Sequence, residues 1–138
     1  MILDAQNLFS KAQAVTATAL STNIVDLGEG DAGPSERLSL FVSAGPPFTV
    51  TGVNDATITV ELQTADAATA TDLTTPVTVA SYPVSEDALK AGGKLLAARL
   101  PHGMKRYARL NYVVTLGSST TIADGKITSG LVWDAQSA

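Results

Sequence analysis

The stretch from residue 56 to residue 64, ATITVELQT, alternates strictly between apolar and polar side chains. Ile58, Val60 and Leu62 fall on one side of an extended chain, while threonine, glutamate and glutamine fall on the other. A period of two residues is typical of a β-strand that buries one face, whereas a helix needs apolar residues about every 3.6 positions. This segment therefore predicts a sheet with one face in a core.

Further segments carry the same signal, with β-branched or aliphatic residues at alternate positions. Loops rich in glycine, proline, asparagine and aspartate separate them. About eight short strands with almost no helical pattern between them predict an all-β fold, an antiparallel β-sandwich of jelly-roll type. The other expected strands lie at residues 14–20, 23–27, 37–44, 75–82, 93–100, 108–116 and 126–134.

At most one short helix is expected, within residues 85–93. Ser85 is a suitable N-cap, and the acidic side chains of Glu86 and Asp87 favour the first turn of a helix. Gly92 or Gly93 would end it. Residues 64–76 are mostly alanine and threonine, which predicts an exposed loop or a weak pair of strands.

A length of 138 residues fits one β-sandwich domain over residues 1–138. Residues 1–20 are expected to form an N-terminal arm or an edge strand, because Ile2, Leu3, Leu8 and Phe9 precede the first strong strand. An arm of this kind frays when it stands alone. We therefore expect it to pack on its own sandwich or on a partner.

Composition excludes several classes of function. A net charge of −4 argues against a nucleic-acid partner, because binding a phosphate backbone requires clustered cations. The chain has no cysteine, hence no thiolate metal ligand and no thiol nucleophile. The N-terminus lacks the basic region of a signal peptide, and the longest apolar stretch falls short of the roughly 20 residues that span a bilayer. A soluble protein made in the cytoplasm, with no membrane partner, is expected.

Few residues could carry catalysis. His102 is the only histidine, and its Pro-His-Gly context favours a turn residue over a general base or a metal ligand. Asp26, Glu29 and Asp31 predict a solvated acidic loop, with calcium binding as the alternative. A glycosidase is disfavoured because the chain has few aromatic residues on which a sugar could stack. The sequence predicts no enzymatic activity, no cofactor and no metal site.

The segment from residue 100 to residue 114 holds three of the nine Lys+Arg residues. Alternation places Arg109 and Asn111 on the strand face opposite Leu110 and Tyr112. Two interpretations are open: an ordinary solvated strand face, or cations that dock on acidic groups of another protein. Together with the apolar residues of the arm, the candidate protein-contact residues are Ile2, Leu3, Phe9, Lys105, Arg106 and Arg109.

Residues 8–28, 100–118 and 125–136 resemble the Bbp16-type capsid cement (decoration) proteins of tailed bacteriophages, with weaker support from residues 37–43 and 58–64. The resemblance implies a small jelly-roll sandwich on the outside of the virion capsid, made in the cytoplasm of a bacterial host. It implies a homo-oligomer, a dimer rather than a trimer, that clamps neighbouring major capsid protein subunits after the shell expands. It implies no catalytic residues.

A second interpretation is a carbohydrate-binding or adhesive β-sandwich domain on a virion surface. It requires an exposed aromatic side chain, and the candidates are Tyr107, Tyr112 and Trp133. An enzyme ranks third, since so few acid and base residues are available.

Overall fold

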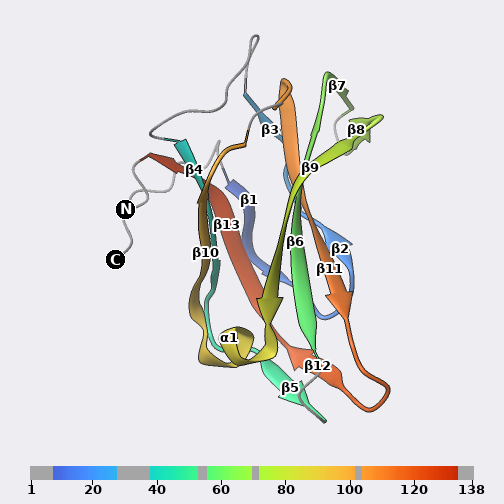
Figure 1. Ribbon diagram of the computed structural model, residues 1–138, viewed down its shortest axis with the longest axis vertical. Coiled ribbons are helices and arrows are strands. Elements are labelled where there is room, and N and C mark those ends of the chain that lie inside the picture. The colour runs from blue at the N-terminus through green and yellow to red at the C-terminus, as the bar shows by residue number, and fades with distance from the viewer. Residues whose placement is uncertain (1–7, 28–37, 53–55, 70–71, 102–103, 134–138) are drawn as a thin grey trace.

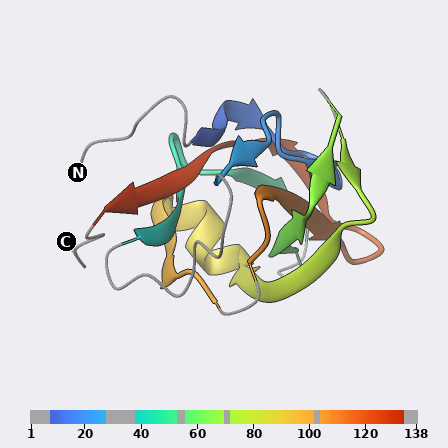
Figure 2. The same ribbon diagram turned by 90° about the horizontal axis from the view of Figure 1, so that it is seen from above.

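The computed structural model describes residues 8–27, 38–52, 56–69, 72–101 and 104–133. Two antiparallel sheets stack on each other in two layers (Figures 1 and 2). In chain order the strands are β1 (Leu8–Ala14), β2 (Ala19–Leu20), β3 (Val25–Asp26), β4 (Leu38–Ala44), β5 (Thr49–Thr51), β6 (Thr57–Ala65), β7 (Ala67–Ala68), β8 (Leu73–Thr74), β9 (Val77–Ser85), β10 (Gly93–Arg99), β11 (Tyr107–Thr115), β12 (Thr121–Asp124) and β13 (Lys126–Trp133).

The strand order is that of a jelly roll. The four-stranded sheet has the order β1-β13-β4-β10, and the five-stranded sheet has the order β2-β11-β6-β9 with β3 also paired to β11. The pairs are nested: β1 with β13, β2 and β3 with β11, β4 with β10, and β6 with β9. Nested pairs are what results when one long antiparallel ribbon rolls up into two sheets. The predicted all-β jelly-roll sandwich is confirmed.

Eight strand positions make up the two sheets, as expected, but the described residues contain thirteen strands. The position beside β11 is shared by the two short strands β2 and β3. Two short pairs, β5 with β12 and β7 with β8, account for the other four. The β7–β8 pair lies within residues 64–76, so of the two alternatives expected there, an exposed loop or a weak strand pair, the strand pair is confirmed.

The core lies between the inner faces of the two sheets. Strand β6 alternates as its sequence predicts, with Ile58, Val60 and Leu62 fully buried. Leu40 and Val42 of β4 meet them from the opposite sheet. Because apolar burial is the main driving force of folding, the apolar residues determine which face of each strand points to the core.

The short helix α1 (Glu86–Ala91) is confirmed, and it covers one end of the sandwich (Figure 1). The Ser85 side chain accepts a hydrogen bond from the Ala88 N–H, as an N-cap does. Gly92 ends the helix with a φ of 72°, a backbone conformation that favours glycine. Leu89 anchors the helix, since its side chain is fully buried.

The strand expected over residues 14–20 was wrong in position. The chain runs in the four-stranded sheet as β1 up to Ala14, leaves it, and enters the other sheet at β2. Two register shifts interrupt the pairing of β1 with β13, and Ala12 has a φ of 49°. These irregularities bury Phe9 and Ser10 in succession, so the alternation that identifies a strand is missing.

Among the described residues, no helix is long and apolar enough to cross a membrane.

Candidate functional site

Arg106, one of the three cations singled out in the sequence, binds an aspartate of its own chain. Its Nε and Nη2 atoms donate to Oδ1 and Oδ2 of Asp26 at 3.0 and 3.1 Å. The guanidinium carbon lies 5.1 Å from the centroid of the Tyr107 ring. Strand β3 brings Asp26 opposite Tyr107, which explains why a residue so distant in sequence becomes the partner. This two-point geometry is the one that arginine and carboxylate groups favour.

Arg109 is also held by its own chain, and it is only 7% exposed. Its Nε donates to Oε1 of Gln63 on β6 at 2.8 Å, and its Nη1 donates to Oδ1 of Asp72. The hydrogen bond from Arg109, together with one from the Leu73 N–H, holds the pKa of Asp72 below its usual value. Arg109 therefore fastens the segment before β8 to the outer side of the five-stranded sheet.

Lys105 has the weakest of these attachments. Its Nζ lies 3.6 Å from Oδ2 of Asp66, and both side chains are exposed. Exposed ion pairs of this kind contribute little to stability. Each of the three cations thus has an acidic partner within the chain, which fits an ordinary strand face. Their contact with another protein stays a prediction.

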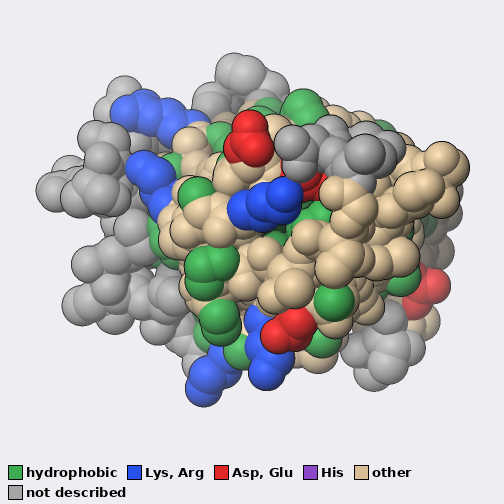
Figure 3. Space-filling model, turned by 90° about the horizontal axis from the view of Figure 1, so that it is seen from below, with side chains coloured by type: hydrophobic (Ala, Val, Ile, Leu, Met, Phe, Trp, Pro, Cys, Tyr) green, Lys and Arg blue, Asp and Glu red, His purple; other side chains and the backbone are tan. Residues whose placement is uncertain are grey.

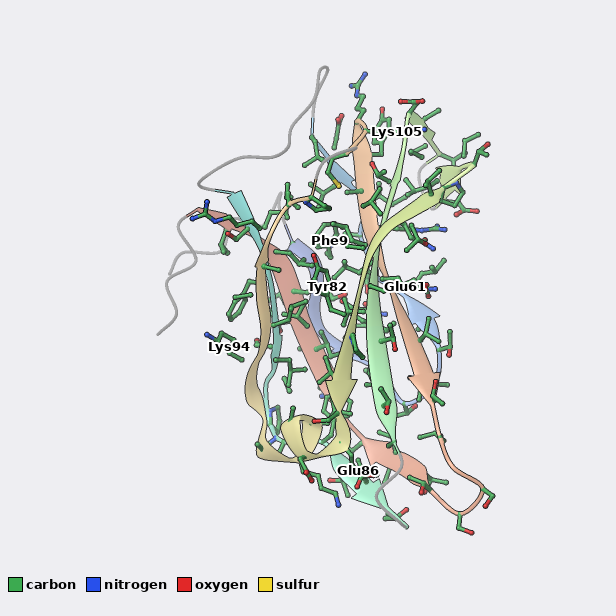
Figure 4. The ribbon with its side chains drawn as sticks, in the orientation of Figure 1. Phe9, Glu61, Tyr82, Glu86, Lys94 and Lys105 are labelled. Carbon is green, nitrogen blue, oxygen red and sulfur yellow. The ribbon has the colours of Figure 1, made fainter. Side chains whose placement is uncertain are left out.

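The structure separates the remaining candidates. Phe9 is fully buried and lies between the two sheets, so its side chain is not available to a partner (Figure 4). Ile2, Leu3, Glu29, Asp31 and His102 lie outside the described residues. Tyr112 is fully buried, and its ring cannot serve as an exposed platform for a sugar. Within the described ranges, no three histidine, aspartate or glutamate residues form a group that could hold a metal ion.

A buried polar cluster that the sequence did not predict joins the two sheets. The Tyr112 hydroxyl of β11 shares hydrogen bonds with Ser10 Oγ of β1 at 2.8 Å and with Ser129 Oγ of β13 at 2.6 Å. Ser10 also donates to Oε1 of Gln13 at 2.6 Å. Burial raises the pKa of Tyr112. The polar groups of the cluster form hydrogen bonds with one another, and these bonds connect the two sheets. We therefore assign the cluster a structural role.

The outer face of the four-stranded sheet carries a second feature that the sequence did not predict. Lys94 and Arg99 on β10 and Lys126 on β13 are all exposed there. None of them has an ion pair or hydrogen-bonded side-chain partner in the part of the chain that the structure describes. A signal was available: the segments that became these strands contain lysine and arginine but no acidic residue.

Comparison with known protein families gives a match over most of the chain. A family model described as Bbp16 matches residues 9–131, a range that includes nearly every described strand of both sheets. No curated protein sequence matches the chain.

Proposed function

Because the chain belongs to the Bbp16 family, we propose that it is a structural protein of a tailed-phage virion. In this proposal it binds the outside of the capsid and cements neighbouring major capsid protein subunits, which stabilises the mature shell. The observation that carries the proposal is the family match over residues 9–131. The proposal assigns the protein no enzymatic reaction, no cofactor, and no nucleic-acid or membrane partner.

The architecture supports this role in two ways. A jelly roll offers two broad sheet faces, and a broad face suits contact with an extended lattice better than a deep pocket does. The Tyr112 cluster and the apolar core hold these faces in a fixed relation, so little ordering is needed when the protein docks. No observation in the described ranges favours the carbohydrate-binding alternative.

The physical mechanism is mass action on an assembled shell. A protein that binds only the expanded lattice stabilises it by about 2.7 kcal/mol per site at a hundredfold excess over Kd. From the resemblance to the Bbp16-type proteins, we propose that the protein acts as a homodimer rather than a trimer. Two linked contacts raise the effective affinity far above that of one. Modest contacts repeated over many sites then hold the shell.

Co-sedimentation tests the proposal. Purified protein, whose oligomeric mass is first measured by light scattering, is mixed with expanded and with unexpanded capsids of its phage. We expect a discrete oligomer that sediments with expanded shells and raises their melting temperature. A protein that remains in the supernatant with both kinds of capsid would contradict the proposal.

A further inference from the structure

The charges of the protein are unevenly divided between its two sheets. Strands β1, β4, β10 and β13 contain four of the nine lysine and arginine residues and none of the thirteen acidic residues. The rest of the chain therefore carries five cations and thirteen acids, a net charge of −8. Within an acidic protein, the four-stranded sheet is a basic layer.

Strand register places three of these four cations, Lys94, Arg99 and Lys126, on the outer side of the sheet. Leu40, Val42 and Ala44 of β4 face the core, so the residues between them face outward. Lys94 lies opposite Ser43, and Arg99 lies opposite Ser39. Ile127 of β13 is fully buried, so its neighbour Lys126 points outward. Figure 4 shows Lys94 directed away from the sandwich.

The arrangement is visible on the molecular surface. Figure 3 keeps the left and right of Figure 1, in which the four-stranded sheet lies on the left. In this view from below, the blue lysine and arginine side chains at the left edge have no red acidic side chain beside them, whereas blue and red side chains lie close together in the middle (Figure 3).

An apolar row crosses the sheet between Lys94 and Arg99. Phe41 of β4 lies opposite Ala97 of β10 on one side and opposite Gly130 of β13 on the other. Phe41 keeps part of its ring exposed, and its two neighbours are too small to cover it. An aromatic anchor at the centre and polar or charged side chains at the rim are the usual anatomy of a protein interface. We call Phe41, Lys94, Ala97, Arg99 and Lys126 the cationic sheet face.

We infer that the cationic sheet face docks on a carboxylate-rich protein surface. This inference rests on the proposed function, in which that surface belongs to the outside of the capsid. The cations complement carboxylates and have no acidic partner in the described part of the chain, while Phe41 supplies the apolar contact. A symmetric dimer through this face is disfavoured, because it would bring cations against cations.

Capsid binding by a pair of matched variants tests the inference. Lys94→Gln with Arg99→Gln removes two exposed cations and takes the net charge from −4 to −6. Val77→Glu with Thr115→Glu reaches the same net charge by adding two acids at exposed positions of the five-stranded sheet. Circular dichroism melting checks that both variants keep the fold, and sedimentation at several salt concentrations measures their affinity for expanded capsids.

We expect the first variant to bind about tenfold more weakly and with a shallower salt dependence, because two rim charges are lost. The affinity of the second variant for expanded capsids should stay within about twofold of that of the original protein.

If the original protein binds and the first variant binds equally well, or if both variants bind equally weakly, the cationic sheet face is not the docking face and the proposed function stands. If the original protein binds no capsid, the proposed function fails first. Capture of double-stranded DNA that the first variant alone loses would replace the protein partner with a nucleic acid.

Discussion

On the outer side of the five-stranded sheet, Arg109 and Asn111 of β11 donate hydrogen bonds to Gln63 and Glu61 of the neighbouring strand. On the outer side of the four-stranded sheet, Lys94 and Arg99 have no such partners among the described residues. Both sheets bury the same kind of inner face and belong to the same nested set of strand pairs.

The difference shows that a charged side chain on a strand has two distinct uses. When its partner lies within the chain, the charge helps to hold the sheet and its hairpins together. When the chain supplies no partner, the charge contributes to solubility and to contact with other molecules. Arg109, which has partners, and Arg99, which has none among the described residues, should therefore respond differently to mutation.

The largest expected effect falls on the inner faces, where the two sheets should behave alike. Leu40→Ala in β4 and Leu62→Ala in β6 each remove a nearly fully buried side chain. Each should lower the free energy of unfolding by about 2–5 kcal/mol, because a cavity is left in the core. Urea denaturation measures both values. A loss much smaller in one variant than in the other would mean that the sheets differ inside as well as outside.

The next effect distinguishes the two outer faces. Arg109→Met should destabilise the protein by about 1.5–3 kcal/mol, because two hydrogen bonds of a buried guanidinium are lost. Arg99→Met is the matched control at an exposed position. Its free energy of unfolding should stay within about 0.5 kcal/mol of that of the original protein. Equal values from urea denaturation would show that the pairing of Arg109 does not stabilise the sheet.

A smaller effect is expected where the sheets meet. Tyr112→Phe removes the hydroxyl that Ser10 and Ser129 share, at a cost of about 0.5–1.5 kcal/mol near neutral pH. Burial raises the pKa of Tyr112, so its neutral form stabilises the fold at low and neutral pH, and this contribution is lost as pH rises beyond about 10. The difference in stability between the two proteins should therefore narrow in alkali. Melting temperatures recorded from pH 7 to pH 11 test this, and a constant difference would contradict it.

The smallest effect concerns Asp72, whose carboxylate is exposed. The hydrogen bond from Arg109 lowers its pKa, so the charged form contributes stability that is present above pH about 4 and lost as pH falls below it. Asp72→Asn should be slightly less stable than the original protein at pH 7 and equal to it near pH 2. Denaturation at both pH values measures the difference. A difference that persisted at pH 2, where the carboxyl group is protonated, would show that the charge of Asp72 is not its cause.

The fold was largely predictable because most strands satisfy the same local rule. From Thr57 to Thr64 of β6, buried residues alternate with half-buried polar ones, and Ser85 with Gly92 delimits the helix in the same local way. Strand β1 broke the rule, since Phe9 and Ser10 are buried in succession around a register shift. A bulge depends on the partner strand, and the identity of that partner is not encoded locally.

The surface was harder to predict than the fold. The cationic character of residues 105–109 was clear in the sequence, but the partners of Arg106 and Arg109 are Asp26 and Asp72, which are 80 and 37 positions away. The cationic sheet face is assembled from β4, β10 and β13, which lie far apart in the sequence. Only the sheet order shows that these segments share one side of the molecule.

The pairing of β1 with β13 has a consequence for how the protein is made. Ala12 donates a hydrogen bond to Thr128, 116 positions further along the chain. During synthesis β1 leaves the ribosome well before β13, and it has no partner until the residues between the two strands and β13 itself have been made. Until then Phe9 and an unpaired strand edge are exposed, and such segments favour aggregation. Nascent chains arrested before β13 should therefore leave the β1 amides open to hydrogen exchange, and release of the last strand should close them.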